Sequence, residues 1–233
     1  MRRLSKLAVA AGACALAAIT WSLWIDWQRP ASVFDHDTLP FYAAADLRPR
    51  WDRISSVMRI GGFQLIDQRQ RAVDRQLLDR GPTVVNLFFA GCVSVCPVSM
   101  DLLRTLHASF GDTPPQFVSL TVSPLTDDVP ALAAYADRFG LPKDWLLLTG
   151  EPKQVEDWAR RSLHSDISKP GADGLPPHTE RAFLIDRWHR IRGIYDARSP
   201  HEMVRLRHDV TALRLEESGA PAPFAAPHRT ASR

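Results

Sequence analysis

Cysteine is scarce in this sequence of 233 residues, which contains only Cys14, Cys92 and Cys96. Cys14 falls in an apolar segment near the N-terminus, so Cys92 and Cys96 have no other cysteine to pair with in the rest of the chain. The sequence also lacks a large excess of charge of one sign, because 29 basic and 26 acidic residues leave a net charge of +3. This small excess gives no reason to predict a nucleic-acid partner. No internal repeat is present, and the length predicts one domain with appendages.

The two remaining cysteines follow a short apolar run, residues 84–89, and precede Pro97. Such a run is typical of a buried strand, Gly91 permits a sharp turn, and Pro97 suits the first turn of a helix. Both thiols are therefore predicted at the carboxyl end of a strand, beside a helix N-terminus. The helix dipole there favours the thiolate, which is the form that attacks disulfides and binds soft metal ions.

Three residues separate Cys92 from Cys96, which leaves room for an internal disulfide or for a chelated metal ion. The spacing alone does not decide between them. A cysteine pair near a strand–helix junction suggests thioredoxin-like redox chemistry, although that signature has two intervening residues. A structural disulfide or two buried thiols is the alternative without chemistry, because cysteine is among the most buried residue types.

The sequence around and beyond the cysteines resembles the Sco/SenC family of thioredoxin-fold, copper-binding assembly factors for the copper centre of cytochrome c oxidase. The resemblance covers roughly residues 60–215 and is carried by residues 88–97 (FFAGCVSVCP), 118–124 (VSLTVSP) with Pro130 and Tyr135, and 178–186 (HTERAFLID). Three positions carry residues other than those common in the family, and none of them is a ligand position: Ala90, Val93 and Ser123.

In the Sco/SenC family two cysteines and a histidine just before a late strand bind copper. By motif position, the resemblance implies that these ligands are Cys92, Cys96 and His178. Two thiolates and one imidazole suit Cu(I), and they can hold Cu(II) if the sulfurs are protected from oxidation. A closed structural zinc site usually has a fourth protein ligand. The other histidines of the folded part are predicted to be solvated: His107, His164, His189, His201 and His208.

An uncharged segment, residues 7–25, follows Arg2, Arg3 and Lys6. Its length is close to the roughly 20 residues that a helix needs to cross a bilayer, so it predicts an N-terminal transmembrane anchor. The positive residues before it place residues 1–6 in the cytoplasm. We therefore expect a single-pass protein of the bacterial inner membrane with its soluble part in the periplasm. A cleaved signal peptide is the alternative.

Beyond the anchor, the sequence predicts a tether over residues 26–62, an α/β domain over 63–217 and a disordered tail over 218–233. Predicted strands and amphipathic helices alternate in the domain. This order favours a mainly parallel central sheet with helices on both faces, in keeping with the thioredoxin-like fold that the resemblance implies. After a first hairpin, predicted strands cover residues 84–89, 116–122, 145–148, 181–186 and 190–195, and predicted helices begin near Pro97, Asp127 or Asp128, Pro152 and Pro200.

Two functions of different classes agree with these observations. The first is a membrane-anchored copper-binding protein that delivers copper to, or helps assemble, the copper centre of cytochrome c oxidase; its partner is the copper-binding oxidase subunit or another copper protein. The second is a thiol–disulfide oxidoreductase in which Cys92 and Cys96 reduce the cysteines of a client. His178 separates the two, because the metal site requires it and dithiol exchange does not. A peroxiredoxin-like function is disfavoured, since no signature of a peroxidatic cysteine is present.

Overall fold

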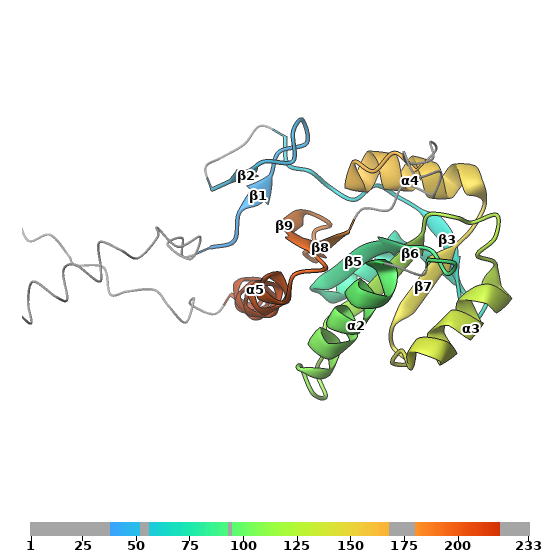
Figure 1. Cartoon of the computed structure of the whole chain (residues 1–233). Coiled ribbons are helices and arrows are strands. Elements are labelled where there is room, and N and C mark those ends of the chain that lie inside the picture. The colour runs from blue at the N-terminus through green and yellow to red at the C-terminus, as the bar shows by residue number, and fades with distance from the viewer. Residues whose placement is uncertain (1–37, 52–55, 93–94, 168–179, 220–233) are drawn as a thin grey trace, which may run out of the picture. The chain divides into compact units, whose positions relative to one another are not determined.

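A seven-stranded sheet with the order β4-β3-β7-β6-β5-β8-β9 forms the centre of the domain (Figure 1). The computed structural model describes residues 38–51, 56–92, 95–167 and 180–219. Its strands are β1 (Phe41–Tyr42), β2 (Pro49–Arg50), β3 (Gln64–Asp67), β4 (Ala72–Asp74), β5 (Thr83–Phe88), β6 (Gln116–Thr121), β7 (Leu146–Thr149), β8 (Arg181–Ile185) and β9 (Ile191–Asp196). Its helices are η1 (Arg75–Arg80), α2 (Val95–Ala108), α3 (Val129–Phe139), α4 (Pro152–Leu163) and α5 (Pro200–Ser218).

The sheet is mixed. Only the central strands β5, β6 and β7 run parallel to one another, whereas β3 pairs antiparallel with β4 and β7, and β8 pairs antiparallel with β5 and β9. The prediction of a mainly parallel sheet is therefore wrong. Parallel neighbours need a crossover connection, which α2 and α3 supply between the central strands; the outer pairs β3–β4 and β8–β9 are joined by tight turns and can only be antiparallel.

Helices cover both faces of the sheet, as predicted. In Figure 1, α4 lies on one side of the strands and α2 and α3 lie on the other. Helix α5 packs against α2 and β9. Every residue of β5 and of β7 is buried. Burial on both faces explains why these strands appear in the sequence as continuous apolar runs and not as alternating patterns.

Two hairpins, β3–β4 and β8–β9, are closed by the same arrangement of side chains. In the first, the buried carboxylate of Asp67 accepts from the backbone N–H of Arg71 at 2.9 Å and from its Nε at 2.8 Å. In the second, Asp186 accepts from the backbone N–H of Arg190 at 2.8 Å and from its Nε at 2.7 Å. The residue before each arginine has a positive φ, 60° and 65°. The carboxylate bonds stabilise turns that contain no glycine.

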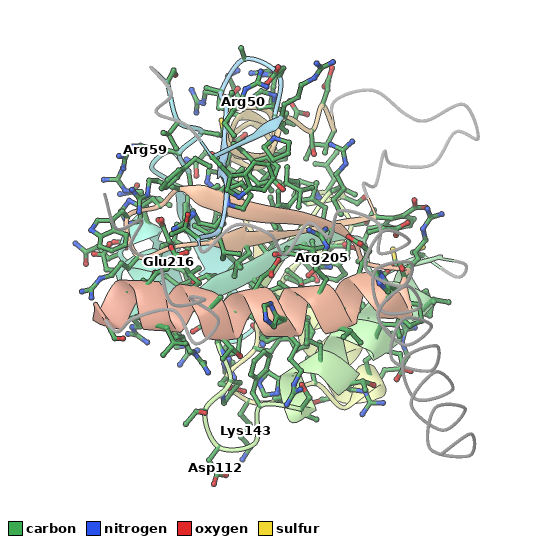
Figure 2. The ribbon with its side chains drawn as sticks, turned by 90° about the vertical axis from the view of Figure 1, so that its left-hand side faces the viewer. Arg50, Arg59, Asp112, Lys143, Arg205 and Glu216 are labelled. Carbon is green, nitrogen blue, oxygen red and sulfur yellow. The ribbon has the colours of Figure 1, made fainter. Side chains whose placement is uncertain are left out.

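The β1–β2 hairpin, which belongs to the predicted tether, packs against β9. Tyr42 of β1 is part of the buried core, and the polar part of the attachment centres on the buried Arg192 of β9, which donates to the carbonyl oxygens of Leu39 at 2.9 Å and Pro40 at 3.1 Å. The same guanidinium pairs with Glu216 at 2.7 Å and with Asp186 at 3.5 Å. Glu216 lies near the C-terminal end of α5, where Figure 2 labels it. The segment before the sheet is thus tied to the last helix of the domain.

Several predictions concern residues that the structure does not describe. The predicted cytoplasmic segment, residues 1–6, the predicted anchor, residues 7–25, and the predicted tail from residue 220 onward all lie outside the described ranges. Within the described ranges, none of the helices combines the length and the apolar character that crossing a bilayer requires.

Candidate metal and dithiol site

The cysteine pair lies where the sequence predicted it, between the carboxyl end of β5 and the start of α2. Cys92 follows the last residue of β5 by four positions, and Cys96 is in the first turn of α2. The backbone N–H of Cys96 donates to Sγ of Cys92 with a nitrogen–sulfur distance of 3.3 Å. Each cysteine is 5% exposed, and the two are not joined in a disulfide. The site therefore contains two adjacent thiols that are shielded from solvent.

The expectation of a thiolate at the helix N-terminus is wrong for Cys96. Burial, together with a hydrogen bond to the Cys92 side chain and the nearby negative charge of Asp127, raises the pKa of the Cys96 thiol to about 12. A buried thiolate loses its hydration, and here that loss outweighs the helix dipole. At neutral pH Cys96 is therefore a thiol, and binding a metal ion through its sulfur requires the release of its proton.

Asp127 and Asp128, the two predicted caps of α3, have separate roles. Asp128 is the N-cap of α3 and accepts from the backbone N–H of Ala131 at 2.9 Å. Asp127 is buried and points elsewhere: its carboxylate accepts from the backbone N–H of Ala90 at 2.9 Å and from Oγ1 of Thr121 at 2.5 Å. This contact with the cysteine loop could not be predicted from the sequence, because no local pattern links residues so far apart in the chain.

Tyr135 of α3 packs against the strand that leads to the cysteines. Its ring centroid lies 5.0 Å from that of Phe88 and 4.4 Å from that of Phe139. Its hydroxyl is buried and has no hydrogen-bond partner among the described residues. Burial raises the pKa of Tyr135, and proximity to Cys96 raises it further. The phenol therefore keeps its proton next to the dithiol.

We expect Tyr135→Phe to leave the free energy of unfolding within about 0.5 kcal/mol of wild type or to raise it, because a buried hydroxyl without a partner contributes no hydrogen bond. Tyr195→Phe is the matched control, since the Tyr195 hydroxyl donates to the buried carboxylate of Asp209 at 2.8 Å. That variant should lose about 1–3 kcal/mol. Urea unfolding of the three proteins measures both values, and an equal loss in the two variants would contradict the expectation.

The third predicted ligand, His178, lies outside the described residues, so the structure neither brings it to the cysteines nor separates it from them. Within the described ranges no group of three histidine, cysteine or acidic side chains is gathered as a metal site would require. The prediction of solvated histidines is right for His201, whose side chain is 85% exposed. It is wrong for His107, which is buried, packs on Trp145 and contacts Asp144 at 3.1 Å.

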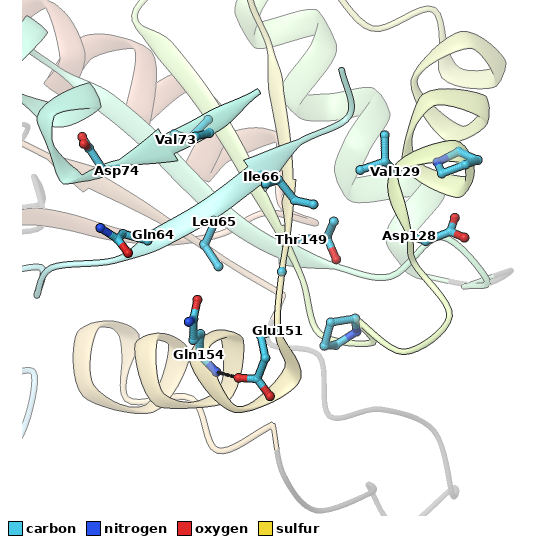
Figure 3. Close-up of a pocket in the computed structure, with 14 residues that line it drawn as sticks. Gln64, Leu65, Ile66, Val73, Asp74, Asp128, Val129, Thr149, Glu151 and Gln154 are labelled. Carbon is cyan, nitrogen blue, oxygen red and sulfur yellow. Dashed lines mark hydrogen bonds between the residues drawn. The ribbon is translucent and has the colours of Figure 1, made fainter. Parts of the chain in front are cut away.

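A pocket of about 790 Å³ lies beside β3 and β4 and the first turns of α3 and α4 (Figure 3). Its wall is mainly apolar, and neither Cys92 nor Cys96 lines it. Each of its three carboxylates accepts a backbone N–H as a helix cap: Asp74 from Gln76 at 2.8 Å, Asp128 from Ala131 at 2.9 Å and Glu151 from Gln154 at 3.0 Å. The dithiol, not this pocket, is the candidate site.

A mixed sheet covered by helices, with two thiols where a central strand meets a helix, defines a thioredoxin-like protein. The sequence model of one such family, SCO1/SenC, matches residues 55–211. The chain belongs to this family. A human relative, the mitochondrial SCO2 homolog, is 43% identical over 101 residues, which cover 41% of this chain and 36% of that protein. The match thus spans little more than a third of that relative.

Solved structures confirm the thioredoxin-like α/β fold. The SCO1/SenC lipoprotein from Bacillus anthracis has a TM-score of 0.62 at 23% identity, covering 67% of this chain and 95% of that one. BsSco is a member of the Sco family of cytochrome c oxidase assembly proteins in which a disulfide switch was identified. It has a TM-score of 0.60 at 20% identity, covering 68% of this chain and 95% of that one. ScoI of Bradyrhizobium japonicum, solved with copper bound, has a TM-score of 0.55 at 22% identity, covering 66% of this chain and 98% of that one.

Proposed function

We propose that this chain is a membrane-anchored copper-binding protein that delivers copper to, or helps assemble, the copper centre of cytochrome c oxidase. The observation that carries the proposal is the pair of adjacent soft donors, with the Cys96 nitrogen 3.3 Å from the Cys92 sulfur. Family membership and the copper-bound ScoI structure support it. The partner is the copper-binding oxidase subunit or another copper protein.

Copper is the cargo, and its proposed ligands are Cys92, Cys96 and His178. The two sulfurs fit Cu(I), because thiolates are soft ligands and their burial protects them from oxidation. On binding, the proton of Cys96 leaves to solvent, and the metal charge takes its place. With only three protein ligands, one coordination position stays open. An open position allows an acceptor to take the metal by ligand exchange.

The membrane part of the proposal rests on residues 7–25, the uncharged segment that follows three basic residues. It would anchor the chain in the bacterial inner membrane with the domain of residues 63–217 in the periplasm, joined by residues 26–62. Two relatives support a membrane-linked setting: the Bacillus anthracis protein is a lipoprotein, and the human protein is mitochondrial.

The second candidate function is a thiol–disulfide oxidoreductase, which the proximity of the two cysteine side chains favours. In that reaction the thiols of Cys92 and Cys96 lose two protons and two electrons and form a disulfide. The disulfide of the client accepts them and becomes a dithiol. The disulfide switch found in BsSco agrees with such chemistry. This reaction needs no histidine.

Titration with Cu(I) against a chromophoric competitor tests the proposal. The full chain in detergent carries Cys14→Ser in every sample, so that a single thiol pair remains. Wild type should bind one copper, and His178→Ala should lose at least about tenfold in affinity, since it would lose a metal ligand. His201→Ala is the control, because its exposed side chain should leave the affinity unchanged. Equal affinities of wild type and His178→Ala would remove the histidine from the site and favour the oxidoreductase.

A further inference from the structure

The peptide of Ala90, two residues before Cys92, is held by charged side chains at both of its polar atoms. Its N–H donates to the carboxylate of Asp127 at 2.9 Å, and its carbonyl oxygen accepts from the guanidinium of Arg138 at 3.1 Å. The acid lies just before α3 and the arginine in the last turn of α3. Two groups from one helical segment therefore hold the loop that leads to the first cysteine.

Both of these side chains make further contacts. The carboxylate of Asp127 is 2% exposed and accepts from Oγ1 of Thr121, the last residue of β6, at 2.5 Å. The guanidinium of Arg138 lies over the rings of Tyr135, at 5.2 Å, and Phe139, at 5.1 Å. Charged donors and acceptors make the stronger hydrogen bonds of proteins, and here the carboxylate is buried and the exposed guanidinium rests on two aromatic rings.

The rest of the loop is tied to Ala90 by short connections. Phe88 ends β5 and is fully buried, and the N–H of Cys92 donates back to the carbonyl oxygen of Phe89 at 3.2 Å. Ala90 itself offers only a methyl group for packing. The position of the Cys92 sulfur beside the Cys96 N–H therefore depends on the hydrogen bonds that hold the Ala90 peptide.

We propose that Asp127 and Arg138 are positioning residues, which hold the Ala90 peptide from its two sides and thereby keep Cys92 next to Cys96. The proposal deepens the proposed function and rests on its premise that the two sulfurs act as a pair. Two thiols held together have a high effective concentration toward each other, which favours every product that joins them. Loosening the Ala90 peptide lowers that concentration.

The test is the equilibrium of the metal-free full chain, carrying Cys14→Ser, with mixtures of reduced and oxidised glutathione. Each protein molecule that oxidises forms one disulfide and gives two electrons and two protons to one glutathione disulfide, which becomes two glutathione thiols. We expect Asp127→Ala and Arg138→Ala each to lower the equilibrium constant for disulfide formation about tenfold, equivalent to about 30 mV for this two-electron couple.

Conservative variants separate positioning from charge. Asp127→Asn keeps an acceptor oxygen for the Ala90 N–H, and Arg138→Lys keeps a cationic donor, so both should stay within about threefold of wild type. Asp128→Asn is the matched control, because it removes an exposed carboxylate next in sequence that bonds only its own helix. It should leave the equilibrium constant at the wild-type value.

Wild-type equilibrium constants in both alanine variants would overturn the proposal. A second result would also overturn it: Asp127→Asn lowers the equilibrium constant as much as Asp127→Ala does, while Arg138→Ala keeps the wild-type value. The negative charge of Asp127 alone would then explain the effect. If Asp127→Ala does not fold, the exposed Arg138 still decides the question. The readout needs no copper. A chain that fails to bind copper would refute the proposed function and leave this measurement intact.

Discussion

Replacing Arg192 with alanine is expected to lower the free energy of unfolding by about 3–5 kcal/mol, the cost of removing one partner from a buried ion pair. The guanidinium is 2% exposed and pairs with Asp186 and Glu216. It also donates to the carbonyl oxygens of Leu39 and Pro40. Alanine would leave these groups with fewer partners, and the segment that leads into the β1–β2 hairpin would lose its hydrogen bonds to β9.

Urea unfolding monitored by circular dichroism measures this loss. Arg207→Ala is the matched control, because Arg207 is an exposed arginine of α5. This substitution should change the free energy of unfolding by no more than about 0.5 kcal/mol, as most surface substitutions do. A comparable small effect for Arg192→Ala would mean that the buried charge contributes no more than a surface one, and the polar attachment of the hairpin would then be unimportant for stability.

Replacing Cys96 with serine is expected to lower the affinity for Cu(I) by more than about 100-fold, beyond the 10–100-fold that loss of a residue supporting a ligand typically costs. The reason is chemical, since a hydroxyl does not replace a thiolate as a soft ligand. Cys14→Ser is the matched control and should keep the wild-type affinity. Competition titration measures both, and equal affinities for the two variants would exclude Cys96 from the site.

The Cys96 thiol should make the affinity for copper increase with pH. Because the pKa of Cys96 is raised to about 12, its sulfur is protonated in the copper-free chain throughout the neutral range, and each copper bound releases that proton. The apparent affinity of wild type should therefore rise by at least about tenfold per pH unit between pH 6.5 and 8.5. In Cys96→Ser the apparent affinity should rise less steeply with pH, because this proton is no longer released. A wild-type affinity that does not change between pH 6.5 and 8.5 would contradict the prediction.

Local signals in the sequence located the cysteine pair correctly. The run of residues 84–89, Gly91 and Pro97 each restrict the backbone through its own chemistry, so the strand end, the turn and the helix start could be inferred without knowing the fold. The capping box at Ser199 is of the same kind: its side chain accepts from the N–H of Glu202, and α5 begins at Pro200 as predicted. Family resemblance added the expected ligand set, including His178, whose place the described residues do not test.

Other features depended on contacts between distant residues. The outer strands made the sheet mixed because they are joined by hairpins, and His107 became buried because the segment around Trp145 packs on it. No sequence pattern indicated that Asp127 would bond the Ala90 peptide, 37 positions earlier in the chain.

The sequence by itself determined which residues are chemically able to act: two thiols at the end of an apolar strand, in a chain with no other cysteine beyond its first 25 residues. Tertiary structure alone decided their state and their surroundings. It excluded water from Cys96, which raised the pKa of its thiol, and it brought Asp127 and Arg138 to the loop before Cys92. The physical reason is that solvent exclusion and hydrogen bonding across a sheet arise only when segments far apart in the chain pack together.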